Sequence, residues 1–530
     1  MEPIRLIMSG AVVGQELAAE FGPLPPAFLP VGVKRLYELQ LAGLSGAGTV
    51  HLVLPETFVP PQHDSARLGE LSVEIVAIPE GLRLGEAVVY ALNTIGLGDR
   101  PVHILHGDTL ITDPPLDHHD VIIGGVQAHA YAWAEIGMDG ERVSALETVP
   151  AGEEGQGRPV AAGYFAFSSS LDLVRSLTRA RGDFVEGVNL YLGGHAVSME
   201  PAPNWLDFGH VQTFFQSRLA VTTARAFNSV RINGLTAYKA SADQAKMAAE
   251  SNWLAQAPPA LKPYCARLVD AGVADGRGYY QTEYEYLPVL SELFVYGAIA
   301  RRSWLGVLGS CEDFLRLCAL YRGPGSADEV LNALAVDKTA ERLQTFARAT
   351  GFDIEAPLSF EGRPAPSLVD MADVLADELK LDSGRRESVM HGDFCFSNIL
   401  YNARVRRIKA IDPRGVIGGV ASLYGDPRYD LAKLAHSISG RYDQIIAGRC
   451  RARQDGTDYA IDFEALACQP WLDAALSDMR VDGISGADPT VRAVTAGLFL
   501  SMIPLHADRP DRQRAFIANA LRLYLEYDRA

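Results

Sequence analysis

The 530-residue sequence is poor in cysteine and lacks long apolar runs. Its 6 cysteines are scattered without any C-x-x-C pair, so neither a zinc site nor a disulfide framework is indicated. No run approaches the roughly 18 apolar residues of a membrane helix. The N-terminal MEPIRLIMSG is typical of a first β-strand rather than of a signal peptide. We therefore expect a cytoplasmic protein with no membrane insertion.

Basic residues are scarce relative to acidic ones, with 48 Lys and Arg against 65 Asp and Glu, a formal net charge of −17. Nucleic acids and anionic membranes select basic surfaces, so we expect no nucleic-acid partner. A nucleotide substrate stays compatible, because it needs only a local cationic pocket. The length predicts more than one domain, and it leaves open whether the chain forms a homo-oligomer.

Short apolar runs alternate with helical patterns in the first 220 or so residues. IRLIMSG, TVHLVLP, VEIVAIP and PVHILHGD each end in Gly, Pro or Asp, as buried strands do. Between them, LGEAVVYALNTIGL places Leu84, Val88, Ala91 and Ile95 on one helical face. This alternation predicts an α/β domain over residues 1–222, Rossmann-like, with a mostly parallel mixed sheet and ligands at the carboxyl ends of its strands.

The pattern changes after residue 222. FNSVRINGLTAYKAS predicts two short strands about a turn at Asn233 and Gly234. A helical pattern, ADQAKMAAESNWLAQ, follows, then a strand-like YYQTEYEYL and long helical stretches. We expect a second domain over residues 223–530, with a small β-rich lobe at about 223–295 and a helical lobe at about 296–530.

The segment VMHGDFCFSNILYNARVRRIKAIDPRG carries Asp393, Asn398 and Asp412 in a chain without a Walker-type phosphate loop. NILYN and RIKAID predict a hairpin that returns Asp412 to Asn398. Phosphoryl transfer needs a carboxylate near the acceptor hydroxyl, oxygen ligands for Mg²⁺ and a cation on the nucleotide phosphates. Asp393 could accept or orient the proton of the substrate hydroxyl, and Asn398 and Asp412 could bind the metal.

This segment resembles the aminoglycoside phosphotransferase and choline kinase family, whose catalytic loop reads H-G-D-x-x-x-x-N. GDPRYDLAKL, which starts at Gly425, resembles a downstream motif of that family. The resemblance implies a bilobal, protein-kinase-like α+β domain that uses ATP as phosphoryl donor, with Mg²⁺. It also implies that Lys239 binds nucleotide phosphates, with Glu250 as its ion-pair partner.

Two further expectations concern the same domain. TEYEYL resembles the family's hinge, which implies that backbone groups near Glu285 meet the adenine. Asp430 in the downstream motif is expected to buttress the catalytic loop. The family's glycine-rich loop has no counterpart before Lys239, where FNSVRING offers only Gly234.

Three segments of residues 3–220 resemble sugar-1-phosphate nucleotidyltransferases, which are GT-A-like: PPAFLPVGVKRLYELQ, VHILHGDTLI and NWLDFGHVQTFFQSR. The resemblance implies that Asp108 and Asp207 hold Mg²⁺ between a second NTP, which could be CTP, UTP or GTP, and an incoming phosphate. Both reactants are anionic, so a divalent ion and a basic side chain are physically required.

The phosphate loop of that family is altered here to IMSGAVVGQEL, which lacks a following arginine. Backbone N–H groups from Ser9 through Gly10 to Gly14 could still cradle phosphates. The nearest cations that could replace the missing charge are Lys34 and Arg35.

Together these patterns predict a bifunctional enzyme. One half would phosphorylate a small sugar, polyol or amino alcohol, and the other would convert the product into an NDP-activated precursor for a surface (capsular) polysaccharide. Three alternatives stay open: an inactive, nucleotide- or nucleotide-sugar-binding front domain, a glycosyltransferase front domain, and a detoxifying kinase. Asp108 and Asp113 lie five residues apart, which disfavours the D-x-D motif of a glycosyltransferase.

Overall fold

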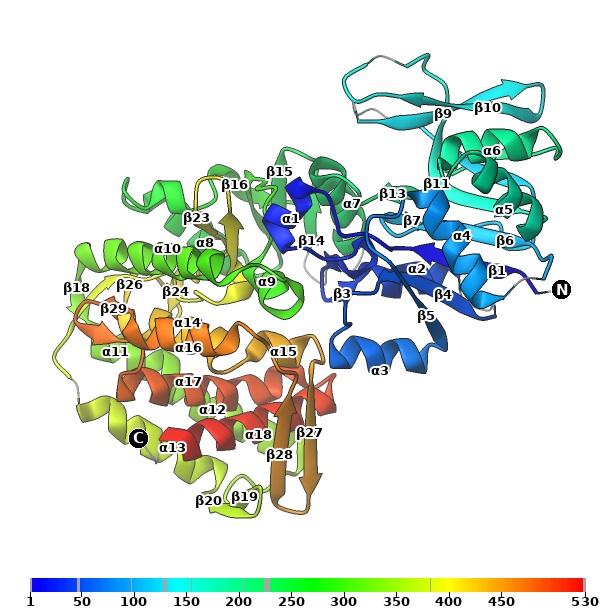
Figure 1. The fold of residues 1–530 in the computed structure, drawn as a ribbon. Coiled ribbons are helices and arrows are strands. Elements are labelled where there is room, and N and C mark those ends of the chain that lie inside the picture. Colours follow the sequence, from blue (N-terminus) through cyan, green and yellow to red (C-terminus); the bar gives the residue numbers. More distant parts are fainter. Residues whose placement is uncertain are drawn as a thin grey trace. The chain divides into compact units, whose positions relative to one another are not determined.

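The computed structural model describes residues 2–44, 48–96, 98–126, 131–153, 155–202, 204–223, 229–381 and 383–527. The chain divides into two compact units. The first unit comprises Met1–Thr222 with Tyr296–Ala298, and the second comprises Thr223–Val295 with Ile299–Ala530. Helices and strands are present in both, so the protein is of mixed α/β class (Figure 1).

A nine-stranded sheet forms the centre of the first unit. In sheet order its strands are β5 (Val73–Ile78), β4 (Val50–Pro55), β1 (Ile4–Met8), β6 (Val102–His106), β11 (Val160–Phe167), β8 (Val121–Gly125), β12 (Ser198–Pro201), β10 (Arg142–Val149) and β9 (Trp133–Asp139). The first four strands are mutually parallel, and β11 is antiparallel to β6. The expectation of a mostly parallel sheet holds for those four strands. Beyond them most pairings are antiparallel. One of these is a hairpin of β9 and β10 about Gly140 and Glu141.

Helices cover both faces of this sheet (Figure 1). They are α2 (Leu36–Gly43), α3 (Gln62–Glu70), α4 (Leu84–Ile95), α5 (Ser170–Arg179) and α6 (Phe184–Leu192); the unit also contains α1 (Gln15–Phe21) and α7 (Val211–Thr223). Successive side chains of a strand point to opposite faces. Leu6 of β1 accordingly packs with α4, α5 and α6, whereas Ile7 packs with Tyr37 of α2 and Leu68 of α3. The predicted apolar face of α4 is confirmed, since Val88 is fully buried.

The second unit opens with a four-stranded antiparallel sheet, here called the small lobe. Its order is β14 (Ser229–Ile232), β15 (Thr236–Ser241), β17 (Arg277–Glu283) and β16 (Leu268–Ala274). The predicted hairpin of β14 and β15 is confirmed, and Gly234 in its turn has φ +87°, which other residues rarely adopt. Strand β16 was not predicted, because most of its side chains are exposed and show no apolar alternation. Helix α8 (Gln244–Gln256), which was predicted, packs against β16 and β17.

Helices make up most of the remaining second unit, here called the helical lobe. They are α9 (Leu290–Tyr296), α10 (Arg301–Leu320), α11 (Ala327–Leu331), α12 (Lys338–Thr350), α13 (Leu368–Leu381), α14 (Pro427–Ile438), α15 (Tyr442–Ile446), α16 (Gln469–Asp478), α17 (Pro489–Met502) and α18 (Pro510–Tyr527). Helix α17 is buried almost all round and contacts α12, α13, α14 and α18 (Figure 1). A helix that is apolar on all sides belongs at the centre of a core.

Short strands between these helices hold the loops in place. The three small sheets that matter most are β18 (Arg322–Ser326) with β21 (Arg386–Val389) and β26 (Tyr424–Gly425), β22 (Ile399–Asn402) with β23 (Arg407–Ala410), and β20 (Arg363–Ala365) and β19 (Leu358–Phe360) with β28 (Asp458–Phe463) and β27 (Cys450–Asp455). The pairing of β22 with β23 confirms the hairpin predicted from NILYN and RIKAID.

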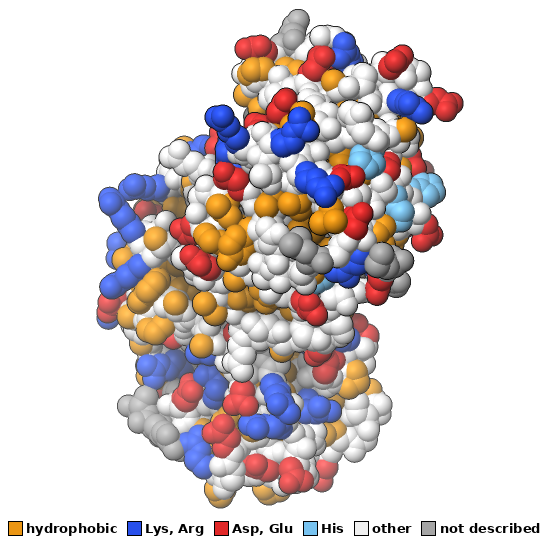
Figure 2. All heavy atoms as spheres, turned by 45° about the vertical axis from the view of Figure 1, so that its right-hand side comes forward, with side chains coloured by type: hydrophobic (Ala, Val, Ile, Leu, Met, Phe, Trp, Pro, Cys, Tyr) orange, Lys and Arg blue, Asp and Glu red, His pale blue; other side chains and the backbone are white. Residues whose placement is uncertain are grey.

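Acidic and basic side chains are interspersed on the face drawn in Figure 2. No helix within the described ranges combines the length and apolarity that a membrane span requires.

Candidate active site

The His391-Gly392-Asp393 triplet lies on the loop between β21 and β22. Asp430, in the first turn of α14, accepts hydrogen bonds from the backbone N–H of His391 at 2.7 Å and of Gly392 at 2.8 Å. Burial raises the pKa of Asp430 to about 7, although these two N–H groups act in the opposite direction. Both oxygens of Asp430 therefore brace the loop, which confirms its predicted buttressing role.

Asp393 ends the triplet with a carboxylate that is 37% exposed. Asn398 Nδ2 donates a hydrogen bond to its Oδ2 at 2.9 Å, and Lys433 Nζ lies 2.9 Å from its Oδ1. Burial by itself would raise the pKa of Asp393, but the cations of Lys433 and Arg414 outweigh it and hold that pKa well below its usual range. The carboxylate is therefore ionised at neutral pH and can accept a hydrogen bond from a hydroxyl group.

Asp412 follows the β22–β23 hairpin, which carries it back toward Asn398. The backbone N–H of Ile411 donates to the carbonyl of Asn398 at 3.0 Å, so the two segments are joined directly before Asp412. The φ of +54° at Asp412 lies in the left-handed region, where a non-glycine residue is uncommon. Such backbone conformations often occur at functional sites.

Two oxygens of this hairpin are available to a cation. Asn398 uses its Nδ2 as a donor to Asp393, and its Oδ1 accepts no hydrogen bond from a described residue. Asp412 uses Oδ1 to accept from the hydroxyl of Tyr280 at 2.8 Å, and its Oδ2 has no described partner. An amide and a carboxylate oxygen suit Mg²⁺, which takes its other ligands from phosphates and water. In the described part of the chain, no three His, Cys, Asp or Glu side chains cluster as a ready-made metal site.

Lys239 of β15 links the small lobe to Asp412. Its Nζ lies 2.8 Å from Glu250 Oε2 on α8 and 3.2 Å from Asp412 Oδ1. Burial opposes the charged form, but Asp412 and Glu250 outweigh it and raise the pKa of Lys239. A charged ammonium is thus held beside the carboxylate that could bind the metal.

Glu285 lies in the segment between β17 and α9 that resembles a hinge. Its side chain forms an ion pair with Lys409 at 3.0 Å, and its carbonyl accepts from the N–H of Leu287 at 2.8 Å. Its own N–H donates to no described residue. The backbone N–H, rather than the carboxylate, is therefore the group of Glu285 that could meet a nucleotide base.

Two residues of this site, Lys433 and Tyr280, were not predicted from the sequence. Lys433 lies within the recognised motif, three residues after Asp430, so the two share one face of α14. That spacing was the signal that could have identified it. Tyr280 carries no comparable signal, because only the pairing of strands β15 and β17 sets it opposite Lys239.

In the first unit, strand β13 (Trp205–Asp207) pairs with β7 (Thr109–Ile111) and brings two carboxylates together. Asp207 lies opposite Thr109, next to Asp108. A Cβ added at Gly209 would lie 2.6 Å from an oxygen of Asp108 and 3.3 Å from an oxygen of Asp207. Burial and the charge of Asp207 raise the pKa of Asp108 to about 6. Paired carboxylates that disfavour their own ionisation suit a divalent cation, which would relieve the repulsion.

The altered phosphate loop follows β1. The N–H of Ser9 is committed to the carbonyl of Val53 at 3.1 Å, and its hydroxyl accepts from the N–H of Ala27 at 3.0 Å. The N–H groups of Gly10 and Gly14 donate to no described residue. Three residues of this loop were expected to bind phosphates. The backbone N–H of Ser9 is already used within the protein, whereas those of Gly10 and Gly14 remain available as donors.

Lys34 and Arg35 have different surroundings. Arg35 is 2% exposed, donates to the carbonyl of Phe28 at 2.7 Å and forms an ion pair with the fully buried Asp64 at 3.4 Å. Lys34 is half-buried, and its ammonium pairs with no described residue. The contacts of Arg35 are those of a packing residue, which leaves Lys34 as the cation available to a ligand.

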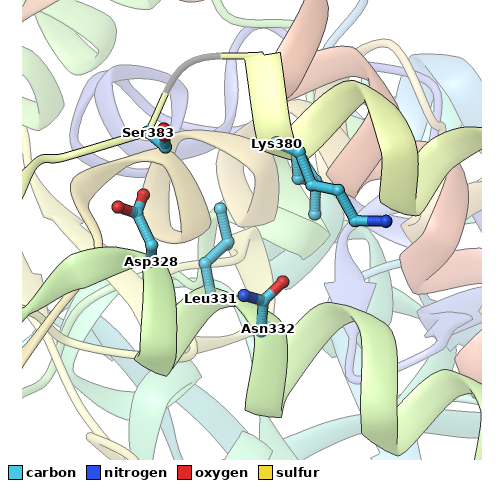
Figure 3. Close-up of a pocket in the computed structure, with 6 residues that line it drawn as sticks. Asp328, Leu331, Asn332, Lys380 and Ser383 are labelled. Atoms are coloured by element: carbon cyan, nitrogen blue, oxygen red, sulfur yellow. The ribbon is translucent and has the colours of Figure 1, made fainter.

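A cavity of about 260 Å³ lies elsewhere in the helical lobe (Figure 3). Its walls come from Asp328, Leu331, Asn332, Leu379, Lys380 and Ser383. The amino group of Lys380 points away from Asp328 in Figure 3 and pairs with Asp377 at 2.7 Å. None of the site residues described above lines this cavity.

No protein-family model matches the chain, and no curated protein matches it. Among solved structures, HddC from Yersinia pseudotuberculosis is 15% identical, with a TM-score of 0.32, over 42% of this chain and 100% of that one. A thermostable mutant of aminoglycoside phosphotransferase APH(4)-Ia is 14% identical, with a TM-score of 0.36, over 56% and 89%. An aminoglycoside-3'-phosphotransferase of type VIII is 13% identical, with a TM-score of 0.30, over 57% and 96%. TM-scores this low establish neither fold nor family, so the functional argument rests on the side chains.

Proposed function

We propose that the second unit transfers the γ-phosphoryl group of ATP to a hydroxyl of a small sugar, polyol or amino alcohol. One observation carries the proposal: the ammonium of Lys239, from the small lobe, lies beside a group formed by the carboxylates of Asp393 and Asp412 and the amide of Asn398. Lys239 lies 3.2 Å from Asp412, and the β22–β23 hairpin joins Asp412 to the hydrogen-bonded pair of Asn398 and Asp393. These are the groups that phosphoryl transfer requires.

The nucleotide side of the reaction would be served by Lys239, with Glu250 holding its ammonium in place. Asn398 and Asp412 would hold Mg²⁺, which when bound neutralises charge on the phosphates. The backbone N–H at Glu285 is our candidate for contact with the adenine.

Asp393 would serve the acceptor side. As the acceptor oxygen bonds to the γ-phosphorus, the bond from phosphorus to ADP breaks and the hydroxyl proton passes to the carboxylate. A carboxylate with a depressed pKa is a weak base, so Asp393 would mainly orient the hydroxyl. A loose transition state demands little more, because the attacking oxygen loses its proton late.

For the first unit we propose nucleotidyl transfer from CTP, UTP or GTP to the phosphate made by the second unit. A phosphate oxygen would attack the α-phosphorus, and pyrophosphate would leave. Asp108 and Asp207 would hold Mg²⁺, with Gly10, Gly14 and Lys34 at the phosphates. The product would be an NDP-activated precursor of the kind consumed in surface (capsular) polysaccharide assembly.

A second candidate makes the first unit a catalytically inactive domain that binds a nucleotide or nucleotide sugar. The observation in its favour is the loss of positive charge from the phosphate loop. No basic side chain lies between Ser9 and Gly14, and Arg35 is held by Asp64. Lys34 alone would then face a triphosphate.

Two assays on the full chain separate these proposals. ADP release from ATP with a panel of sugars, polyols and amino alcohols tests the kinase, and pyrophosphate release from each NTP with a panel of sugar phosphates tests the transferase. Asp393→Ala should abolish the first activity and preserve the second, and Asp108→Ala should do the reverse. If both variants stay folded yet each loses both activities, the two-site proposal is wrong. Absence of pyrophosphate with every NTP would favour the inactive-domain candidate.

A further inference from the structure

A second group of cations, distinct from Lys239 of the small lobe, lies near Asp393. Helix α12 begins at Lys338, directly after a π-helical segment, Asn332–Asp337. π-Helical turns are rare and are often found at functional sites. Lys338 is half-buried, and its ammonium makes no hydrogen bond or ion pair with any described residue.

The charged groups that act most strongly on Lys338 are mostly cations. Burial lowers the pKa of Lys338 to about 8, and three nearby cations act in the same direction: Arg414, Arg342 and Lys433. Asp393 is the carboxylate that acts against them. Arg342 lies one helical turn after Lys338 and is anchored by its Nη1 to the carbonyl and hydroxyl oxygens of Ser501, at 3.1 and 2.6 Å.

The charges around Asp393 do not balance. Lys433 pairs with Asp393, and Arg414 is held by the carbonyl of Gly392 at 2.9 Å and the hydroxyl of Tyr429 at 3.2 Å. Asp430 uses both oxygens for backbone N–H groups. Glu341, also on α12, is exposed and adjoins Arg342. The four cations therefore outnumber the two exposed carboxylates near them, those of Asp393 and Glu341, and half-buried cations without counter-charge are costly.

These cations are separate from the one that would serve the nucleotide. Lys239 interacts with Asp412 and Glu250, whereas Lys338 interacts with Asp393, the residue assigned to the acceptor hydroxyl. An excess of positive charge on the acceptor side favours an anionic acceptor and disfavours an amino alcohol.

We propose that the hydroxyl substrate also carries an anionic group, a phosphate monoester or a carboxylate, which the ammonium of Lys338 binds beside Asp393. This inference rests on the proposed kinase function and narrows its substrate class. Arg342 and Arg414 add to the attraction without giving up their present hydrogen bonds.

The test offers the full-length protein Mg–ATP with two matched series of acceptors. One is glucose, glucosamine, glucuronate and a glucose phosphate; the other is glycerol, ethanolamine, glycerate and glycerol phosphate. We expect the anionic members to show the highest kcat/KM. Whether the carboxylate or the phosphate ester has the lower KM identifies the group that is bound.

Variants at Lys338 then connect this preference to the site. Lys338→Met should raise KM for the anionic acceptor by about tenfold to a hundredfold, with KM for ATP unchanged, and Lys338→Arg should restore most of the loss. The matched control is Lys380→Met, which removes an exposed lysine of the same lobe. Unchanged binding of Mg–ADP, measured by calorimetry, shows that each variant is folded, and Lys338→Gln serves if the Met variant is not.

Three outcomes would overturn the inference. If amino alcohols are preferred and Lys338→Met has no effect, the acceptor is not anionic, while the kinase function stands. If Lys338→Met raises KM for ATP instead, the cluster serves the nucleotide phosphates. If the wild-type protein phosphorylates none of these compounds although it binds Mg–ADP, the kinase function fails and this inference fails with it.

Discussion

Lys433 Nζ lies 2.9 Å from Asp393 Oδ1, and Lys433 is three residues after Asp430 on α14. Through Asp430 this helix braces the backbone of the loop that carries Asp393, and through Lys433 it keeps the Asp393 carboxylate ionised. The proposed chemistry depends on both effects, because a hydroxyl must meet a fixed and ionised acceptor.

Replacement of Asp393 tests the carboxylate directly. Asp393→Asn keeps the size of the side chain but removes its charge, so phosphoryl transfer should slow about a hundredfold to ten-thousandfold. Binding of Mg–ADP should stay close to that of the wild type. Asp377→Asn, at an exposed position of α13, is the control. Retention of more than about a tenth of the wild-type kcat would argue against this role.

The pH dependence of kcat tests the Lys433 contact. In the wild type the pKa of Asp393 is depressed, so the carboxylate stays ionised and its protonation should not lower kcat between about pH 5 and 8. In Lys433→Met, burial is opposed by fewer cations, the pKa of Asp393 rises, and kcat should fall as the pH falls through the raised value. Profiles measured by ADP release that superimpose for both proteins would contradict this account.

Lys239 and Glu250 are expected to act on the nucleotide. Lys239→Met should raise KM for ATP and lower kcat, with a combined loss of about 2–3 kcal/mol in kcat/KM, because a charged hydrogen-bond donor to the phosphates is removed. Glu250→Gln should act in the same direction with a smaller effect. Lys246→Met is a matched control, since Lys246 is 54% exposed and lies 3.8 Å from Glu250. An equal loss in the control would mean that stability of α8, not phosphate contact, is at stake.

Replacement of Lys34 should affect NTP binding by the first unit, whereas replacement of Arg35 should affect its stability. Arg35→Met leaves the buried Asp64 with less compensation, so the first unit should lose about 3 kcal/mol or more of its free energy of unfolding. Lys34→Met should change stability by less than about 0.5 kcal/mol but raise KM for the NTP. Urea titration and pyrophosphate release measure the two effects. A stable Arg35→Met protein with impaired NTP binding would reverse the assignment.

Local patterns in the sequence predicted much of the secondary structure. The β14–β15 hairpin followed from its Asn-Gly turn, and helix α4 followed from apolar residues three and four positions apart. Strand β16 was missed because its exposed side chains show no alternation. A mixed sheet was predicted, but not which of its strands pair, because pairing between distant strands leaves no mark in a single segment.

The sequence by itself determined the order of the chemical groups: Asp393 and Asn398 lie just before the β22–β23 hairpin and Asp412 just after it, so the hairpin brings them together. Only the tertiary structure decided which charges surround them. Lys433, Tyr280 and Lys338 come from a helix, a strand and another helix, and their effect on the site depends on distance and burial. Electrostatic interaction acts through space, so residues far apart along the chain can set the ionisation of one carboxylate without any signal in its own segment.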